Sequence, residues 1–107
     1  MSTMKNSTRN LARYETALDI LNMMVAGLSA DIATEEAGHR PSEVAIAKMA
    51  RDQRDYRRAA LALNPDDADA IEEVIKVYGP LQRSKRAQRA AVIGAESGKR
   101  TSAARAG

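Results

Sequence analysis

Apolar residues in the first third of the chain recur at alternating spacings of three and four. This row comprises Leu11, Tyr14, Leu18, Leu21, Val25, Leu28 and Ile32. Three heptads at this spacing predict a helix of roughly 30 residues and about 45 Å, from about Thr8 to Ala37, packed lengthwise against another helix. A second row beside the first comprises Ala17, Ile20, Met24 and Gly27. Because the two rows widen the apolar surface, one neighbouring helix cannot cover both.

Three prolines divide the rest of the chain, and each suits the first turn of a new helix better than the middle of an old one. Gly38 is suited to the left-handed position after the first helix, and Pro41 opens a second helix that continues to about Leu63. The turn between these helices is short, so the two helices are expected to be antiparallel. The second helix carries its own apolar row, namely Ile46, Met49, Gln53, Tyr56, Ala60 and Leu63.

Asn64 and Pro65 are expected to cap and open a third helix, which Gly79 and Pro80 end. Its apolar row is Ala68, Ile71, Ile75 and Tyr78. Residues 81–93 then predict a short basic fourth helix. The pattern therefore predicts an all-α chain, a small antiparallel helical bundle over residues 1–93, followed by a disordered basic tail over residues 94–107.

Composition makes the core of this bundle thin. Of 47 apolar residues, 21 are alanine, and the chain has neither Phe nor Trp. It has no cysteine, which favours a reducing, cytoplasmic location. Asp19, Asn22 and Asp31 interrupt the most apolar region, so the sequence predicts neither a membrane span nor a secretory signal, and no membrane partner.

Positive charge is concentrated at the C-terminus. Residues 1–82 hold 10 basic and 13 acidic residues, whereas residues 83–107 hold 7 and 1. Such a segment can neutralise phosphates, dock on an acidic protein surface, or only keep the chain soluble. The residues expected to bind nucleic acid or an acidic partner are Arg83, Lys85, Arg86, Arg89, Lys99 and Arg100. Basic residues on the second helix alternate with Asp52 and Asp55. Lys48 and Asp52 have the i, i+4 spacing, as do Arg51 and Asp55, which is typical of a solvated helix face.

The sequence offers little catalytic chemistry. The only histidine, His39, lies in a predicted turn, and no glycine-rich phosphate loop is present. The acidic residues that follow Pro65 lack the glycine and glutamate spacing of a calcium loop, and helix-dipole stabilisation accounts for the first of them. We therefore expect a protein that is not an enzyme and has no cofactor or metal site.

Two functions remain open. In the first, the protein binds one protein partner, as an adaptor, an inhibitor, or an antitoxin-like or anti-defence protein, and is expected to form a homodimer. The interface would use the second apolar row with its neighbour, Ala17, Ile20, Met23, Met24 and Gly27, unless this row faces the third helix. In the second, the basic C-terminal arm binds DNA or RNA with little sequence preference. A third reading, in which the first helix lies on anionic lipid, is disfavoured because it lacks aromatic anchors.

Overall fold

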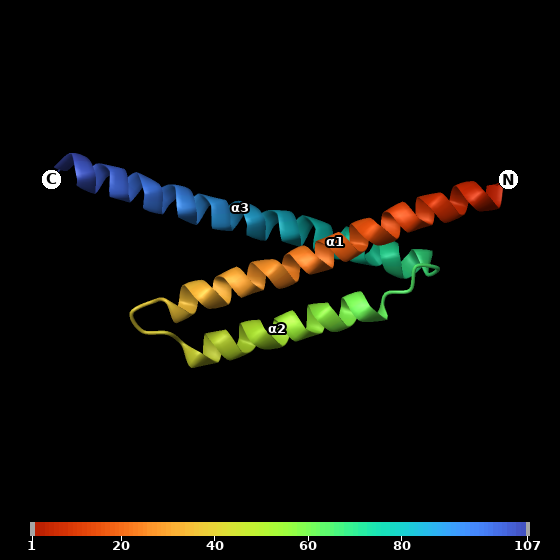
Figure 1. Ribbon diagram of the computed structural model, residues 1–107, viewed down its shortest axis with the longest axis horizontal. Coiled ribbons are helices and arrows are strands. Elements are labelled where there is room, and N and C mark those ends of the chain that lie inside the picture. The colour runs from red at the N-terminus through yellow and green to blue at the C-terminus, as the bar shows by residue number, and fades with distance from the viewer. Residues whose placement is uncertain (1, 107) are drawn as a thin grey trace.

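The computed structural model describes the backbone of residues 2–106 and the side chains of residues 9–92. It contains three helices: α1 (Ser2–Glu36), α2 (Glu43–Ala62) and α3 (Ala68–Ala106). Within the described backbone no strand is present, so the predicted all-α class is confirmed. The helices form an elongated molecule of 69 × 31 × 15 Å, with the two termini at opposite ends (Figure 1).

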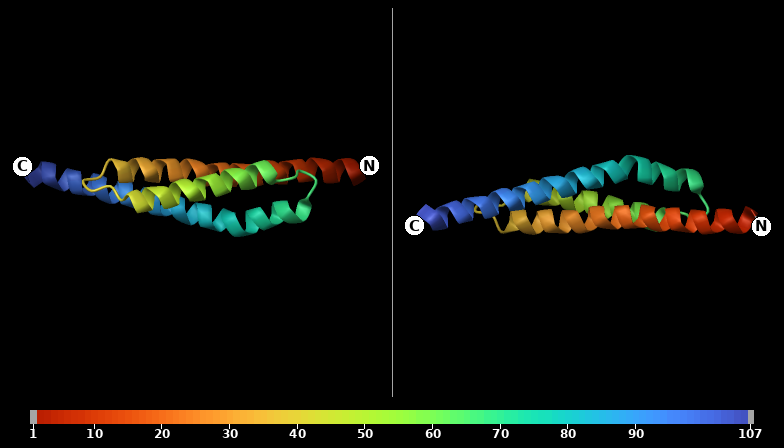
Figure 2. Two further views of the ribbon diagram at one scale, coloured as in Figure 1. Left: turned by 90° about the horizontal axis from the view of Figure 1, so that it is seen from below. Right: turned by 90° about the horizontal axis from the view of Figure 1, so that it is seen from above.

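α1 is the central helix. It forms an antiparallel hairpin with α2, as the short turn predicts, and α3 runs in the same direction as α1 and crosses it (Figure 1). Two further views place α3 on one side of the hairpin and leave the other side of the hairpin without a covering helix (Figure 2). α1 packs against both neighbours, whereas the backbones of α2 and α3 do not approach within 8 Å.

The two apolar rows of α1 meet different helices. At Val25, in the first row, the backbone carbonyl of α1 accepts a hydrogen bond from Gln53 of α2. In the second row, Ile20 lies against Gly79 of α3 and Gly27 lies against Arg89. The expectation that one helix cannot cover both rows is therefore confirmed.

The core is as thin as the composition indicates. Among the side chains of residues 9–92, the buried apolar ones are Ala17, Ile20, Leu21, Met24, Leu28, Leu63 and Ile71. Leu21 and Ile71 are the largest that are fully buried. Tyr56 of α2 and Tyr78 of α3 bridge their two helices edge to face, with ring centroids 5.7 Å apart.

The turn between α1 and α2 differs from the prediction at its glycine. Gly38 does not adopt the left-handed conformation; its N–H instead donates to the carbonyl of Glu35 at 3.1 Å, closing a tight last turn. The Oε1 of Glu35 then accepts from the N–H of Ser42 at 2.9 Å. Ser42 is the N-cap of α2, since its Oγ accepts from the N–H of Ala45 at 3.1 Å.

The start of α3 also differs, and the prediction of Asn64 as its cap is wrong. Asn64 and Asp67 are the ends of a turn, in which the carbonyl of Asn64 accepts from the N–H of Asp67 at 3.0 Å. Pro65 suits the second position of such a turn as well as it suits a first helical turn. Asp67 caps the helix instead, because its Oδ1 accepts from the N–H of Ala70 at 3.0 Å.

Gly79 and Pro80 do not end α3, which continues through Pro80. Residues 81–93 therefore extend α3 rather than forming a separate fourth helix. Proline removes one backbone hydrogen bond from a helix and bends it, and Figure 2 shows α3 bent in its teal part. Buried Gly79 lies at the crossing with α1, so the two residues shape a helix crossing and not a helix end.

The remaining predictions about the chain end lie outside the described side chains. The boundary at residue 93 and the disordered basic tail over residues 94–107 therefore stay predictions.

Candidate functional site

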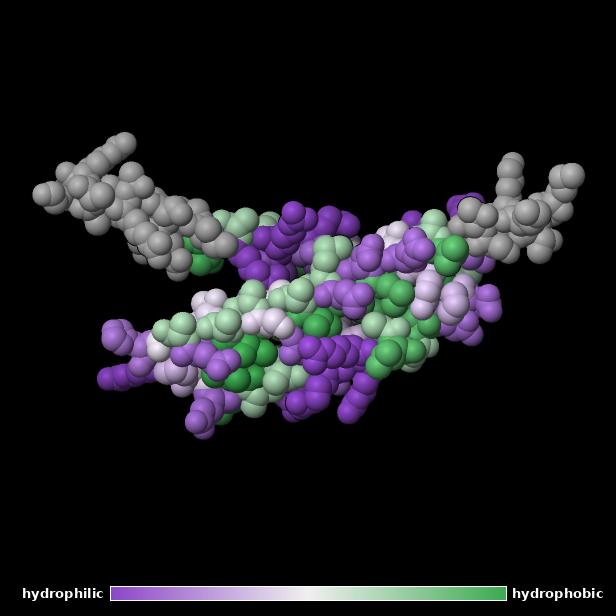
Figure 3. All heavy atoms as spheres, in the orientation of Figure 1, coloured by the Kyte–Doolittle hydropathy of each residue, from purple (hydrophilic) through white to green (hydrophobic). Residues whose placement is uncertain are grey.

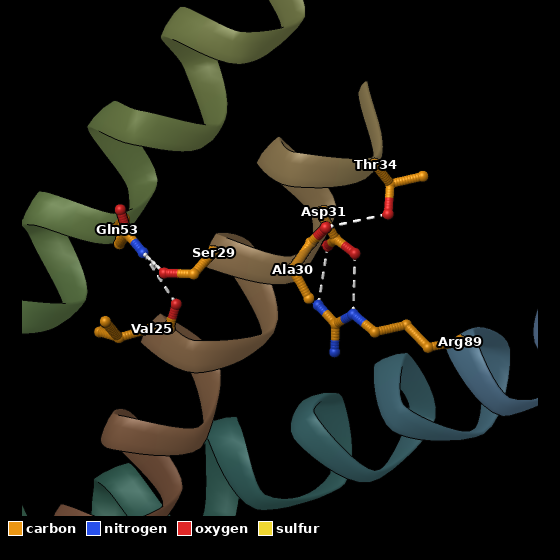
Figure 4. A network of polar contacts seen from close by, with 7 residues as sticks. All are labelled: Val25, Ser29, Ala30, Asp31, Thr34, Gln53 and Arg89. Atoms are coloured by element: carbon orange, nitrogen blue, oxygen red, sulfur yellow. Dashed lines mark hydrogen bonds and ion pairs between the residues drawn. The ribbon is translucent and has the colours of Figure 1, made fainter. Parts of the chain in front are cut away.

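A bidentate ion pair joins α1 to α3 beyond their crossing. The Nε and Nη2 atoms of Arg89 each donate to one carboxylate oxygen of Asp31, both at 2.8 Å (Figure 4). The guanidinium lies against Gly27, where a Cβ atom would be 2.5 Å from the Nη1 of Arg89. Glycine at position 27 therefore makes room for this pair.

The pair also sets the charge states of both groups. The hydrogen bonds from Arg89 lower the pKa of Asp31 against the opposing effect of desolvation, and the positive charges of Arg89 and Lys85 add to the lowering. The same hydrogen bonds raise the pKa of Arg89. Both groups are therefore charged at neutral pH, in a geometry that is stronger than a single ionic contact.

An open groove of about 370 Å³ lies at this end of the molecule, between α1 and α3. Figure 3 shows the space between the two helices as a notch. Its lining residues are Ala30, Asp31 and Thr34 of α1 with Lys85, Gln88, Arg89 and Val92 of α3. The Thr34 hydroxyl already donates to the carbonyl of Ala30 at 2.9 Å, and Asp31 is paired with Arg89. The groove thus offers apolar contacts, the Gln88 amide and the ammonium of Lys85.

Gln53 joins α1 to α2 on the other side of the same region. Its side-chain amide is buried and donates to the carbonyl of Val25 at 2.9 Å and to the hydroxyl of Ser29 (Figure 4). The polar residue in the middle of the second helix's apolar row is therefore a specific interhelical contact. No buried side-chain polar atom lacks a partner among the described residues.

The apolar row proposed as an interface is covered within the monomer. Ala17, Ile20 and Met24 are buried, and Gly27 is half-buried against Arg89. Only Met23, 41% exposed, is open to a partner. The row lies along α3, which is the alternative that the sequence left open, so a partner can reach it only if α3 moves. Its role as an interface stays a prediction.

The basic residues proposed to bind phosphates or an acidic partner do not act as one group. Arg89 is paired internally with Asp31, and Lys85 is half-buried in the groove. Arg83 and Arg86 are exposed. The side chains of the other two candidates, Lys99 and Arg100, lie outside the described residues.

Sequence reasoning missed the groove because none of its features is a motif. Ala30, Thr34 and Val92 are ordinary helix residues whose neighbourhood depends on the angle at which α3 crosses α1. The available signal is a small residue at position 27 and a long cation, Arg89, on another helix, but no spacing rule connects two positions so far apart in the sequence.

The acidic residues near Pro65 do not gather into one cluster among the residues that the structure describes. In the described part of the chain, no three His, Asp or Glu side chains could hold a metal ion together. Glu72 instead accepts two hydrogen bonds from Arg13 of α1, at 2.7 and 2.6 Å. This exposed pair joins α1 to α3 on the opposite side of the crossing from Asp31 and Arg89.

One segment of the described chain, Arg9–Glu36 within α1, is long and apolar enough to cross a membrane. The central helix of a water-soluble protein passes the same test, and α1 packs against both α2 and α3. The expectation that the protein has no membrane partner stays a prediction.

Comparisons with protein families, with curated protein sequences and with solved structures find no match to this chain.

Proposed function

We propose that this protein is not an enzyme and acts by binding a protein partner, as an adaptor or inhibitor does, through the groove between α1 and α3. The observation that carries the proposal is the groove itself, which is open, has apolar walls and lies between two helices joined by the Asp31–Arg89 pair. Grooves between helices are a common site for an amphipathic partner helix, whose apolar side chains insert between the two walls.

The chemistry of the groove indicates what this partner carries. Val92, 56% exposed, and Ala30 supply apolar contact, and Lys85 supplies positive charge near the floor. Arg89 and Asp31 neutralise each other, so Lys85 is the one charge among the lining residues without an ion-pair partner. A helix with small apolar residues and a carboxylate on the same face therefore fits best.

The test is to recover partners from cells with tagged wild-type protein and with two matched variants. Val92→Glu places a carboxylate in the groove, whereas Val77→Glu places one on α3 outside the groove, at a side chain of similar exposure, 46% against 56%. We expect Val92→Glu to lose the partner and Val77→Glu to retain it. Circular dichroism shows whether both variants keep the helical content of the wild type.

Two results would contradict the proposal. The first is a partner that is retained equally by wild type and Val92→Glu. The second is loss of the partner from Val77→Glu alone, which would place the interface elsewhere on α3.

A second candidate function is nucleic-acid binding, and the exposed arginines of α2 favour it. Arg51, Arg54, Arg57 and Arg58 are all exposed, and within residues 9–92 none of them has an ion pair. Only Lys48 forms the expected i, i+4 pair, with Asp52 at 2.9 Å. Unpaired arginines along one helix can each replace a counterion on a phosphate backbone.

Substitution is a better test of this candidate than deletion of residues 83–107, because that deletion also removes Arg89 from its pair with Asp31. We expect an Arg54→Ala, Arg58→Ala double variant to bind labelled DNA or RNA more weakly than wild type, with a smaller dependence of affinity on salt. Arg83→Ala and Arg86→Ala test the C-terminal arm in the same assay. Binding that none of these variants changes would rule out both basic surfaces.

A further inference from the structure

The α1–α2 hairpin has a side that no helix covers. Ile20 and Gly27 of α1 point toward α3. Residues two apart on a helix lie about 160° from each other, so Leu18 and Val25 point away from α3. They belong to a set spaced at seven residues, Leu11, Leu18, Val25 and Ile32, which shares one side of α1.

α2 contributes a matching row. Gln53 faces α1, and Tyr56, on one flank of Gln53, meets Tyr78 of α3. The other flank of α2 therefore points away from α3. It carries Ala50, Arg57 and Leu61. We call the two rows together the hairpin face, defined as Leu11, Leu18, Val25, Ile32, Ala50, Arg57 and Leu61.

The hairpin face combines open residues with apolar residues that are covered only in part, such as Leu18, which packs against the core cluster containing Leu63. Leu61 is 88% exposed and Leu11 is 52% exposed, while Leu18, Val25 and Ile32 are half-buried. Figure 3, which views the hairpin from the side opposite α3, shows hydrophobic residues along both helices. Part of the heptad set of α1 therefore stays uncovered, which is typical of a helix that packs lengthwise against a further helix.

The small core gives a reason for this face to be covered. The molecule is 15 Å thick across its Cα atoms, which is the depth of two packed helix layers, and few apolar side chains are buried among residues 9–92. Small domains with so little buried apolar surface commonly gain the missing stability by oligomerisation.

The charges of the hairpin make it complementary to itself. α1 holds three basic and five acidic residues, whereas α2 holds five basic and three acidic. At the edges of the hairpin face, exposed Glu15 lies between Leu11 and Leu18 on α1, and Arg57 lies on α2. A two-fold axis that lies between the two stacked faces and runs parallel to the helices lays the acidic α1 of each copy over the basic α2 of the other.

We propose that a second copy of this chain packs on the hairpin face, giving a two-fold dimer in which the two hairpins stack as a four-helix bundle. The two α3 helices and their grooves then lie on the outer sides of the dimer. Both grooves remain accessible, so the proposal is independent of what the groove binds.

The first experiment measures the mass of the full chain by light scattering after size exclusion. We expect twice the chain mass of 11.6 kDa for the wild type and half of that for Leu61→Glu. The matched control is Val44→Glu, also on α2 and 83% exposed, but about a quarter turn away from Leu61 around the helix. We expect Val44→Glu to remain a dimer, and circular dichroism checks that both variants fold.

A second experiment needs no disruptive substitution. The chain has no cysteine, so Leu61→Cys and Val44→Cys each introduce one thiol. The two sites are almost equally exposed in the monomer, so a monomer labels both with maleimide at the same rate. In the proposed dimer, the Leu61→Cys thiol reacts about tenfold more slowly at high protein concentration, since access controls thiol reactivity. Dilution that dissociates the dimer removes the difference.

Several results would overturn the proposal. A wild type that is monomeric at every concentration, with equal labelling of the two thiols, leaves the face uncovered. A dimer that survives Leu61→Glu with equal labelling places the contact elsewhere. A monomer that floats with anionic vesicles, and loses this in Leu61→Glu, assigns the face to a lipid surface.

Discussion

Gly27 has a role that depends on the absence of a side chain. A Cβ at this position would lie 2.5 Å from Nη1 and 2.6 Å from Cζ of Arg89, so the guanidinium must move away. Alanine favours the helix by about 1 kcal/mol over glycine, while a partly exposed ion pair contributes about 1 kcal/mol or less. The two effects oppose each other, so the net change in the stability of Gly27→Ala does not test whether Gly27 makes room for the ion pair.

The informative quantity is the coupling between Asp31 and Arg89. We expect a double-mutant cycle with Asp31→Asn and Arg89→Gln to give about 0.5–1 kcal/mol in the wild type and close to zero in the Gly27→Ala background. Urea unfolding of the variants measures both cycles. An unchanged coupling in the Gly27→Ala background would show that the guanidinium reaches Asp31 by another path.

Gln53 gives a second prediction for a single residue. Its amide donates to the Val25 carbonyl and the Ser29 hydroxyl, and a carboxylate of the same shape has no proton to donate. We expect Gln53→Glu to destabilise the protein by about 2 kcal/mol or more at neutral pH, since a buried charge would face a carbonyl oxygen.

Acidification should recover part of this loss, because a protonated Glu can again donate to Val25. Gln53→Leu is the matched control: it keeps the apolar row, buries no charge, and should cost less than Gln53→Glu. Equal destabilisation by both variants would show that the loss arises from packing and not from charge. Urea unfolding at neutral and acidic pH distinguishes these results.

Among the helices, α3 depends most on one residue. Pro80 bends α3 at its crossing with α1, and the bend directs the following turns so that Arg89 reaches Asp31. We expect Pro80→Ala to raise helix propensity by about 3 kcal/mol while weakening the Asp31–Arg89 contact, so that stability increases by clearly less than this amount.

The check is to compare Arg89→Gln in the wild type and in Pro80→Ala by thermal or urea unfolding. Arg89→Gln should cost less when Pro80 is absent. An equal cost in both backgrounds would mean that the bend is not what brings Arg89 to Asp31.

The helices that the sequence predicted best are those with periodic apolar rows. The rows of the first two helices define α1 and α2, and every member of the α2 row, Ile46 to Leu63, is buried or half-buried. Single proline and glycine residues predicted the ends of the helices less well. Pro65 suits a turn and a helix start alike, and Pro80 is accepted inside a helix, next to Gly79, which lies against Ile20.

The contacts between helices were beyond the reach of the sequence. Heptad spacing indicates that a helix has a neighbour, but it does not say which neighbour covers which row. Arg89 is an example, because local sequence makes it one of four basic residues within seven positions. Only the crossing of α1 and α3 brings it to Asp31 and removes it from the basic group. The groove exists for the same reason.

At the scale of the whole molecule, α1 and α3 are joined on both sides of their crossing by bidentate acid–arginine pairs. Arg13 pairs with Glu72 on one side and Arg89 with Asp31 on the other. Each pair lowers the pKa of its carboxyl group, mainly through the hydrogen bonds that the arginine donates. Because α3 makes few contacts with α2, these pairs fix how α3 lies on the hairpin.

The lowered pKa values determine how stability depends on pH. The hydrogen bonds from Arg89 and Arg13 lower the pKa values of the Asp31 and Glu72 carboxyl groups in the folded protein, so the unfolded chain binds more protons at acidic pH. The stabilising effect is therefore fully present above the unfolded pKa and is lost as pH falls through the folded pKa. We expect the urea midpoint to be constant from neutral pH to about pH 5 and to fall below that.

Asp31→Asn should flatten this acid dependence more than Asp52→Asn does. The pKa of Asp52 is also lowered, by Lys48, but that pair lies within α2 and joins no helices. The loss of α3 contact should also be visible directly: in acid, the amides of α3 beyond Pro80 should exchange hydrogen faster than those of α2. Equal acceleration in both helices, with parallel pH curves for the two variants, would show that the arginine pairs do not hold α3 on the hairpin.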